Sequence, residues 1–263
     1  MKISIVTPSY NQAAFIERTI NSIHDQTLSV PLEHIVVDGG SSDGTLDILK
    51  KYQSKIKWVS EKDKGQSDAL NKGIAMASGE IIGWLNSDDV YLPGSLQKVV
   101  DVFIENPEIQ WVYGMCRMID GNDAELRSWI TYYKKVRSLN FRYKRLLTEN
   151  FISQPAVFFR KEAFVRAGGL DLQQHYAMDF DLWLRLGKES APFVIREDIA
   201  AFRLHGTSKS MTNFKKLFSE QYEIHQKYDQ GRFLLFAHRF KISLILLAYK
   251  ALAVIGSATT SKG

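Results

Sequence analysis

Cysteine is nearly absent from this sequence. It occurs once in 263 residues, as Cys116, which excludes an intramolecular disulfide framework and a zinc site built from several thiolates. Cys116 lies in an apolar stretch, so we expect its side chain to be buried in a strand. The N-terminus lacks the apolar core of a signal peptide. Together these absences indicate a cytoplasmic protein.

Long apolar runs are scarce too. The most apolar segment, residues 242–255, is about 14 residues long and contains Lys250, whereas a helix needs roughly 20 apolar residues to cross a bilayer. Because basic residues precede it, the segment could lie on the anionic cytoplasmic face of the inner membrane, as in a peripheral protein. It could equally pack on the rest of the chain or on a second copy in a homodimer. The sequence leaves these two placements open.

The remaining composition is that of an ordinary folded protein. Hydrophobic residues make up 45% of the chain and charged residues 24%, and the length suits one α/β domain with a C-terminal appendage. The net charge of +5 is uneven, because residues 134–145 carry six basic side chains and no acid. Such a segment can face phosphates or form a solvated helix face. No aromatic RNA-binding motif is interleaved with it, so nucleic acid is not an expected partner.

The first 107 residues alternate between short apolar runs rich in β-branched residues and stretches with helical spacing. The pattern predicts strands over residues 2–8, 33–40, 56–61 and 80–86, and helices over 13–26, 42–53 and 65–77. A Ser or Asp cap is expected to open the second helix. Strands separated by helices of this length predict right-handed crossovers and a mainly parallel sheet.

Beyond residue 107 the alternation weakens. We expect a strand over 109–119, helices over 134–150 and 177–188, and an extended stretch over 191–205. Residues 154–171 read as a strand, a short helix and a glycine-rich turn. Two basic amphipathic helices are expected between residues 214 and 255.

Polar residues follow four successive strands of the first part of the chain. They form the segments Thr7–Asn11, Asp38–Gly44, Glu61–Gly65 and Asn86–Asp89. The carboxyl ends of parallel strands meet at one sheet edge, where α/β proteins bind ligands. Any one segment could be turn chemistry alone, but four together favour a site. An acid such as Asp88 at a strand end suits a divalent cation on a diphosphate.

Five motifs occur in the order in which family 2 glycosyltransferases carry them. They are "TPSYN", "VVDGGSSDGT", "GQSDALNKGIAMASGE", "WLNSDD" and "GGLD…MDFDLWLR". On these motifs the chain resembles that family over roughly residues 1–210, and their joint occurrence is more specific than any single motif. The resemblance implies the GT-A fold: an α/β, Rossmann-like, mainly parallel central sheet flanked by helices. It also implies a catalytic domain of residues 1–210, with a nucleotide-sugar half of about 1–107 and an acceptor half of about 108–210, followed by a helical extension of residues 211–263.

The resemblance further implies a nucleotide diphosphosugar donor, with a UDP-sugar favoured. The loop from Thr7 to Tyr10, together with Asp38, resembles the base and ribose contacts, and the Asp63 region a further nucleotide contact. The residues expected to bind donor or acceptor are Thr7, Pro8, Ser9, Tyr10, Asp38, Asp63, Gln66, Asn71, Asn86, Ser87 and Gln154. Trp84 and Trp183 could stack on a sugar or belong to the core.

Asn86-Ser87-Asp88 resembles the Asp-x-Asp signature of the family, whose last acid binds Mn²⁺ or Mg²⁺ at the diphosphate. Asn86 replaces the first acid, which removes a charge and keeps an oxygen acceptor. His205 in "RLHGTSKS" resembles the family's His-x-x-Ser segment, where the ring is a metal ligand or a diphosphate contact. The resemblance therefore implies Asp88 and His205 as metal ligands, with a structural role the alternative for the lone histidine. Nearby Arg203, Ser208 and Lys209 could balance phosphate charge.

Asp179 in "MDFDLWLR" resembles the family's Glu-Asp segment, with Met178 at the Glu position. In inverting members the matching Asp is the general base that takes the proton of the acceptor hydroxyl. Asp181 competes for this role, but two residues apart on a helix the two side chains face different ways. An N-cap role is the alternative for Asp179.

The resemblance implies an enzyme that moves a sugar onto a hydroxyl of a glycan, lipid-linked in the expected case, in bacterial-type surface polysaccharide synthesis. Metal-assisted single displacement with inversion is the expected mechanism. The alternative is a non-catalytic nucleotide-sugar-binding protein, because Asn86 and Met178 depart from the acidic pattern. A dinucleotide-dependent oxidoreductase is disfavoured, since no G-x-G-x-x-G follows the first strand.

Overall fold

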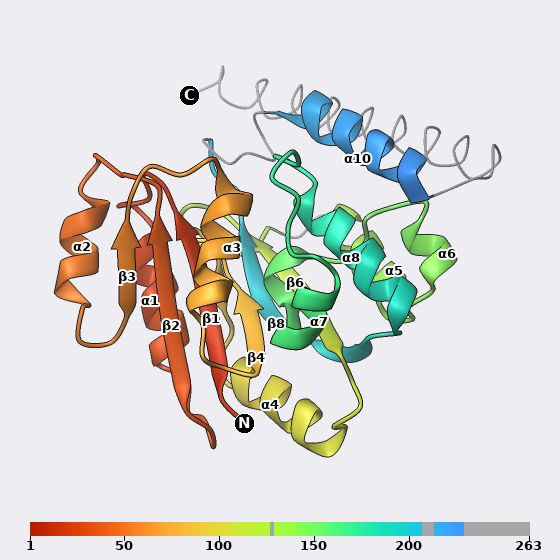
Figure 1. Cartoon of the computed structure of the whole chain (residues 1–263), viewed down its shortest axis with the longest axis horizontal. Helices are drawn as coiled ribbons and strands as arrows, with labels where there is room; N and C mark the ends of the chain where they lie inside the picture. Colours follow the sequence, from red (N-terminus) through yellow and green to blue (C-terminus); the bar gives the residue numbers. More distant parts are fainter. Residues whose placement is uncertain (127–128, 207–212, 229–263) are drawn as a thin grey trace.

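The computed structural model describes residues 1–126, 129–206 and 213–228. Its centre is an eight-stranded sheet in the order β3-β2-β1-β4-β7-β6-β8-β5 (Figure 1). The strands are β1 (Ile3–Ser9), β2 (Leu32–Asp38), β3 (Lys57–Ser60), β4 (Ile81–Trp84), β5 (Val90–Tyr91), β6 (Trp111–Ile119), β7 (Val157–Arg160) and β8 (Phe193–Arg203). The helices are α1 (Ile16–His24), α2 (Thr45–Lys51), α3 (Gln66–Met76), α4 (Ser95–Glu105), α5 (Trp129–Ser138), α6 (Tyr143–Leu146), α7 (Lys161–Arg166), α8 (Met178–Glu189) and α10 (Phe214–Tyr228), with a 3-10 turn η1 (Gln154–Ala156).

The sheet is mixed, with parallel pairing dominant. Strands β1, β2, β3 and β4 pair in parallel, and β6 pairs in parallel with β8. Strand β7 runs antiparallel between β4 and β6, and the short β5 runs antiparallel at the edge beside β8. The predicted α/β class and the predicted strands of the first 107 residues are confirmed.

Side chains alternate between the two faces of the sheet, as a doubly covered sheet requires. On β1, Val6 joins the core cluster that includes residues of α3, α7 and α8, whereas Ile3 and Ile5 join the cluster under α4. A third, smaller cluster fills the space between α1, α2 and Val36 of β2. Layers of helices therefore cover both faces of the sheet.

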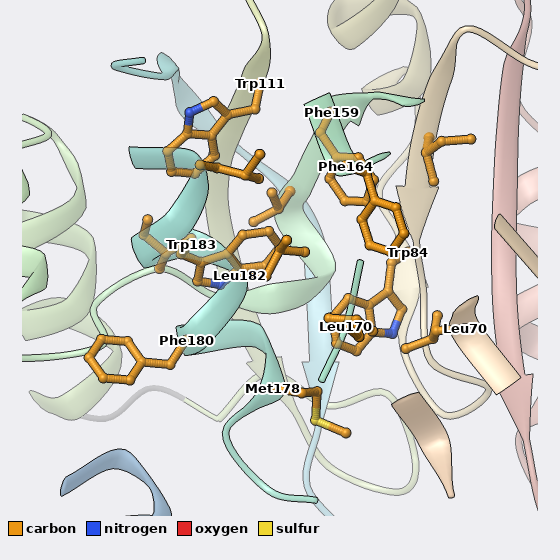
Figure 2. Packing of buried hydrophobic residues seen from close by; sticks show 14 of the residues in the cluster. Leu70, Trp84, Trp111, Phe159, Phe164, Leu170, Met178, Phe180, Leu182 and Trp183 are labelled. Atoms are coloured by element: carbon orange, nitrogen blue, oxygen red, sulfur yellow. The ribbon is translucent and has the colours of Figure 1, made fainter. Parts of the chain in front are cut away.

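Tryptophans occupy the centre of the largest cluster (Figure 2). Trp111 of β6 stacks on Trp183 of α8 with ring centroids 6.0 Å apart, and Trp84 of β4 lies 6.4 Å from Trp183. Trp84 is 2% exposed and Trp183 fully buried. Both belong to the core, so of the two alternatives for these side chains the structure shows packing.

Two helix features differ from the sequence expectations, and a third feature concerns the acidic pair Asp88-Asp89. Helix α2 was expected to open on a Ser or Asp cap, but its N-cap is Gly44, with φ of 98°. Asp43 instead accepts hydrogen bonds from the N–H and hydroxyl of Thr45, because the left-handed turn places this carboxylate over the first helical amide. Residues 139–142 separate α5 from α6, where one helix was expected. Strand β5 separates Asp89 from α4, so the acidic pair precedes an edge strand rather than a helix.

Helix α10 packs on α8, and Figure 1 shows α10 above α8 at the top of the molecule. Ile224 and His225 of α10 are fully buried, and Tyr228 donates a hydrogen bond to Asp181 of α8 at 2.9 Å. Within the described ranges, no helix combines the length and apolar character needed to span a bilayer. The second amphipathic helix and the apolar segment 242–255 lie outside the described residues.

Candidate functional site

The ends of the central strands bring the expected polar segments to one edge of the sheet. Ser9 at the end of β1 pairs with Asp38 at the end of β2, which in turn pairs with Ser60 of β3. On the other side of β1, Val6 pairs with Trp84, so the segment after β4 begins at the same level. The structure therefore brings together the four loops that the sequence singled out.

The turn after β4 is held by α1. The amide of Asp89 donates to the carbonyl of Asn86 at 3.1 Å. The hydroxyl of Thr19, buried on α1, donates to the carbonyls of Ser87 and Asp89 at 2.9 and 2.8 Å. Ser87 is buried. A turn fixed at this many points presents the side chain of Asp88 from a rigid support.

Asn86 is the hub of this turn. Its Oδ1 accepts hydrogen bonds from Gln66 at 2.7 Å and from the indole of Trp84 at 2.8 Å. Its Nδ2 donates to Gln154 at 2.9 Å and to the carboxylate of Asp89 at 3.3 Å. An aspartate at position 86 would place a second carboxylate against that of Asp89. The amide therefore gives a physical reason for the departure from the acidic signature.

Asp89 is fully buried, and burial together with the charge of Asp88 raises its pKa well above the usual range. Its Oδ1 accepts the backbone N–H of Arg203 at 2.9 Å. The guanidinium of Arg203 donates to the carbonyl of Asp88 at 2.7 Å and is itself fully buried. Arg203 thus braces the acidic turn from inside rather than facing a ligand. Ser208 and Lys209 lie outside the described residues.

Asp88 points away from this bracing and meets His205. Oδ2 of Asp88 lies 2.9 Å from Nε2 of His205, and the two side chains are 17% and 9% exposed. The imidazole packs against the ring of Phe15 with centroids 4.5 Å apart. The carboxylate of Asp88 and the imidazole of His205 are thus close enough to coordinate one metal ion together.

The pair Asp88 and His205 fits a divalent cation whose remaining coordination positions are filled by a bound substrate. No cluster of three or more His, Cys, Asp or Glu side chains suited to a metal occurs in the described part of the chain. Mg²⁺ and Mn²⁺ at phosphates commonly take one or two protein ligands and fill the remaining positions with phosphate oxygens and water. An imidazole in the set favours Mn²⁺ over Mg²⁺.

Asp179 occupies the second position of α8, after the N-cap Ala177 and Met178. Its Oδ2 accepts a hydrogen bond from Nδ2 of Asn150 at 3.1 Å. Burial raises the pKa of Asp179, and the Asn150 hydrogen bond and the charge of Lys134 on α5 offset part of that rise. A raised pKa makes the carboxylate a stronger proton acceptor than an ordinary aspartate.

Both carboxylate oxygens of Asp181 are hydrogen-bonded to neighbouring side chains. Its Oδ2 accepts two hydrogen bonds from Arg185, at 3.0 and 2.6 Å, and its Oδ1 accepts the hydroxyl of Tyr228. Arg185 also donates to the carbonyls of Ala167 and Gly169. The two acids of α8 therefore have different partners, as their spacing predicted.

The Asp88 and Asp179 regions are linked by one segment, residues 150–154. Asn150 at its start bonds Asp179, and Gln154 at its end bonds Asn86 and donates to the carbonyl of Trp84 at 2.6 Å. These hydrogen bonds place the acidic turn and the start of α8 around a common region.

The thiol of Cys116, half-buried in β6, has its pKa raised by burial and by the charge of Asp89, while Lys134 opposes that rise.

The predicted base and ribose contacts at the end of β1 differ in accessibility. Thr7 is fully buried, with its hydroxyl 3.0 Å from Nε2 of His34. Pro8 is buried, and the buried Ser9 hydroxyl has no hydrogen-bond partner among the described residues. Tyr10 is 61% exposed. Tyr10 is thus the side chain of this segment that reaches solvent, and the binding role of all four stays a prediction.

Asp38 and Asp63 both hold loop backbone. The carboxylate of Asp38 accepts the amides of Gly40 and Ser41 at 3.0 and 2.9 Å, and the hydroxyls of Ser41 and Ser60. Asp63 accepts the amide of Gly65 and lies against Gly39, where a Cβ would stand 2.7 Å from its Oδ2. These acids therefore shape the loops around the site, and contacts to a nucleotide stay a prediction.

Asn71 faces the glycine-rich turn after α7. It donates to the carbonyl of Leu170 at 2.8 Å and accepts the amide of the same residue at 2.9 Å. These two hydrogen bonds tie α3 to the turn that follows α7, and a direct role of Asn71 in binding stays a prediction.

Several residues of this region escaped the sequence reading. Asn150 and Lys134 belong to no motif and reach Asp179 only through the path of the chain after β6. Asp89 was visible in the quoted motif, but only its burial shows that it braces the turn. In the basic segment 134–145, Lys135 pairs with Asp198 and Arg137 with Glu149, while the charge of Lys134 lowers the pKa of Asp179.

Known proteins resemble the chain both in sequence and in structure. A family model described as Glycosyl transferase family 2 matches residues 4–166. An uncharacterized glycosyltransferase of Nostoc sp. is 31% identical over 228 residues, which cover 81% of this chain and 67% of the relative. A chondroitin synthase of Escherichia coli is 30% identical over 222 residues, covering 82% of this chain and 30% of that protein.

Two solved structures have a similar fold at low sequence identity. The mannosyltransferase PcManGT of Pyrobaculum calidifontis, in complex with GDP-Man and Mn²⁺, has a TM-score of 0.68 and 16% identity, covering 98% of this chain and 79% of that one. S. aureus TarS 1-349, in complex with UDP-GlcNAc, has a TM-score of 0.65 and 19% identity, covering 85% of this chain and 65% of that one.

Proposed function

The chain belongs to glycosyl transferase family 2 and is a glycosyltransferase, and on that premise we propose that it moves a sugar from a nucleotide diphosphosugar to a hydroxyl of a glycan acceptor. Its fold is the GT-A fold. The proposal includes inversion at the anomeric carbon by a single displacement. The observation that carries it is the pairing of a metal-competent Asp88 and His205 with the partly buried carboxylate of Asp179, across the segment 150–154.

The proposed step balances in one exchange. The acceptor hydroxyl oxygen bonds to the anomeric carbon as the bond from that carbon to the diphosphate oxygen breaks. The hydroxyl proton goes to the carboxylate of Asp179, and the nucleoside diphosphate leaves with the electron pair. Asp179 suits this task because its burial favours proton uptake. Retention through a covalent intermediate would require a second carboxylate beneath the sugar.

Asp88 and His205 would hold the divalent cation, Mn²⁺ in preference to Mg²⁺. When bound, such a cation neutralises charge that builds on the departing diphosphate. The complex of PcManGT with Mn²⁺ supports this assignment. The bracing by Asn86, Arg203 and Thr19 keeps Asp88 oriented without a second acid in the signature.

We favour a UDP-sugar as donor, which agrees with the UDP-GlcNAc bound to TarS, while the GDP-Man bound to PcManGT makes a GDP-sugar the first competitor. Tyr10, Asp38, Asp63 and Gln66 are proposed to line the donor side. The relative named a chondroitin synthase supports a glycan acceptor. A lipid-linked acceptor at the cytoplasmic face of a membrane, in surface polysaccharide synthesis, completes the proposal.

A thermal-shift panel tests the proposal. Wild type is titrated with UDP, GDP, CDP and dTDP, each with and without Mn²⁺ or Mg²⁺. The variants Asp88→Ala and Asp101→Asn, the latter an exposed acid of α4, serve as test and matched control. We expect one nucleotide to raise the melting temperature only with metal, in wild type and Asp101→Asn but not in Asp88→Ala. Stabilisation by no nucleotide under any condition would contradict the donor assignment.

Turnover then separates the enzyme from a non-catalytic binder of the same fold. The nucleotide sugars of the selected base are incubated with the protein, and release of the nucleoside diphosphate is measured. Binding without release, with water and with glycan acceptors alike, would favour the binder.

A further inference from the structure

Helix α8, which carries Asp179, begins without a side-chain cap of its own. Its N-cap residue is Ala177. The amide groups that precede and open a helix need acceptors, and an anion is favoured there. Glu220 of α10 supplies them: its carboxylate accepts the backbone N–H groups of His175 at 2.7 Å, Tyr176 at 2.5 Å and Ala177 at 2.5 Å.

Glu220 is presented by a helix that is fixed along α8 (Figure 1). One turn further on, Ile224 is fully buried, and Tyr228 at the end of α10 bonds Asp181 of α8. Lys216, one turn earlier, lies over the ring of Tyr176 at 5.9 Å. The carboxylate of Glu220 therefore has a defined position relative to the first turn of α8.

Asp179 lies two residues beyond the last amide that Glu220 accepts. Its backbone belongs to the first turn of α8, so any fraying of this turn displaces its carboxylate from Asn150. Burial raises the pKa of the Asp179 carboxyl, and the charge of Lys134 on α5 lowers it. Glu220 meets the backbone ahead of α8, and Asp181 is bonded to Arg185 and Tyr228.

We propose that Glu220 is a positioning residue for Asp179, through which α10 sets the geometry of the catalytic base. The inference rests on the proposed function, because it takes Asp179 as that base. It also gives α10 a role in catalysis, beyond covering the core. Glu220 touches none of the residues assigned to donor binding, so its effect should fall on the chemical step.

The test uses Glu220→Gln, Glu220→Ala and the control Glu223→Gln. Glu223 lies on the same helix, is exposed, and accepts a hydrogen bond from the hydroxyl of Ser219 at 3.5 Å. The titration of the Asp179 carboxyl is followed by NMR in ¹³C-labelled full-length protein. We expect its pKa to fall towards the ordinary value in Glu220→Gln, because the turn loosens and the burial that raises the pKa of Asp179 lessens, and to fall further in Glu220→Ala. Glu223→Gln should titrate as wild type.

Turnover is measured on the same proteins, as release of nucleoside diphosphate from the panel donor that wild type consumes. We expect kcat to fall about 10- to 100-fold in Glu220→Gln, with KM for the donor unchanged and the acid limb of the kcat profile moved to lower pH. A glutamine still accepts hydrogen bonds with one oxygen, so Glu220→Ala should be slower than Glu220→Gln.

The outcomes separate this inference from the function on which it rests. A Glu220→Gln protein with a lower melting temperature but with wild-type kcat and Asp179 titration would show a purely structural cap and overturn the inference. If Asp179→Asn kept the wild-type kcat, the assigned base would be wrong, whatever Glu220 did. If Asp179→Asn lost activity while Glu220→Gln kept it, the positioning role alone would fail. Should Glu220→Ala not fold, the near-isosteric Glu220→Gln still gives the decisive reading.

Discussion

The turn after β4 and the first turn of α8 each carry two closely spaced acids, and in both turns the acids divide their work. Asp89 is buried and bonded to the backbone of Arg203, while Asp88 faces His205. Asp181 is bonded by Arg185 and Tyr228, while Asp179 has the amide of Asn150. One acid of each pair braces the turn, and its neighbour is presented to the site.

The difference within each pair shows how a rigid site is built. A carboxylate that reacts or binds metal needs one open side, so its orientation has to come from its surroundings. The bracing acid supplies that orientation through bonds to backbone and guanidinium groups. Substitutions at the four positions should therefore separate into losses of activity and losses of stability.

The largest effect is expected at Asp179. Asp179→Asn keeps the size of the side chain and removes the proton acceptor, so kcat should fall by about 10²- to 10⁴-fold. The melting temperature should be equal to or above that of wild type, because burial disfavours the ionised form of Asp179 and the variant lacks that charge. Steady-state kinetics and thermal unfolding on the same sample check this. A stable variant with wild-type kcat would show that Asp179 is not the proton acceptor.

Asp88→Asn comes second. An amide is a weak ligand for a hard cation, so half-maximal activity should need more Mn²⁺ and kcat/KM should fall by about 10²-fold at fixed metal. Fold stability without metal should change little. Activity is titrated against Mn²⁺, with Asp101→Asn as control; an unchanged metal requirement would argue against Asp88 as ligand.

Asp181→Asn should act on stability instead. The change weakens the charged hydrogen bonds to Arg185 and should lower the free energy of unfolding by about 2 kcal/mol. The kcat of the folded protein should remain within a few-fold of wild type. Urea unfolding measures the first quantity. A loss of kcat as large as that of Asp179→Asn, at wild-type stability, would reverse the two roles.

Asp89→Asn should be milder. Burial raises the pKa of Asp89 well above the usual range, so the neutral amide resembles the form that burial favours. The amide oxygen can still accept the N–H of Arg203, and a loss of about 1 kcal/mol is expected from the poorer contact with Asn86. The same urea titrations check this value, and a loss of metal-dependent nucleotide binding would instead make Asp89 the ligand.

The smallest effect is the pH dependence of stability at Asp179. Its pKa is raised in the folded protein above the unfolded value of about 3.9. The stability this group contributes is present in full below that value and is lost as pH rises through the folded pKa. Asp179→Asn should therefore gain stability relative to wild type as pH rises above about 4. Urea unfolding at several pH values measures the difference, and a constant difference would mean that Asp179 has an ordinary pKa.

The sequence predicted the outline of the fold well, because strand and helix periods are local properties. The strands of the first 107 residues and helix α8 follow directly from apolar patterning. The break between α5 and α6 was missed: the chain folds back there, so that Glu149 accepts hydrogen bonds from Arg137 and Tyr133, and no local pattern shows these contacts. In the predicted extension, α10 packs on α8, while segment 242–255, whose placement was left open, lies outside the described residues.

The candidate site was predictable only where a motif carries it. Asp88, Asp179 and His205 became candidates through motifs, and the spacing of Asp179 and Asp181 indicated that these two side chains face different ways. Asn150, Lys134 and Glu220 were not predictable, since each meets the start of α8 from a distant segment of the chain. The bracing role of Asn86 was hidden as well, because it depends on four partners that the fold brings together.

Anomalous diffraction from crystals grown with Mn²⁺ and the stabilising nucleoside diphosphate would test the central claim most directly. The account predicts one Mn²⁺ peak bonded to the carboxylate of Asp88 and the imidazole of His205, touching the diphosphate, with Asp89 still bonded to Arg203. A peak on Asp89, or a bound nucleotide with its diphosphate away from Asp88, would contradict it.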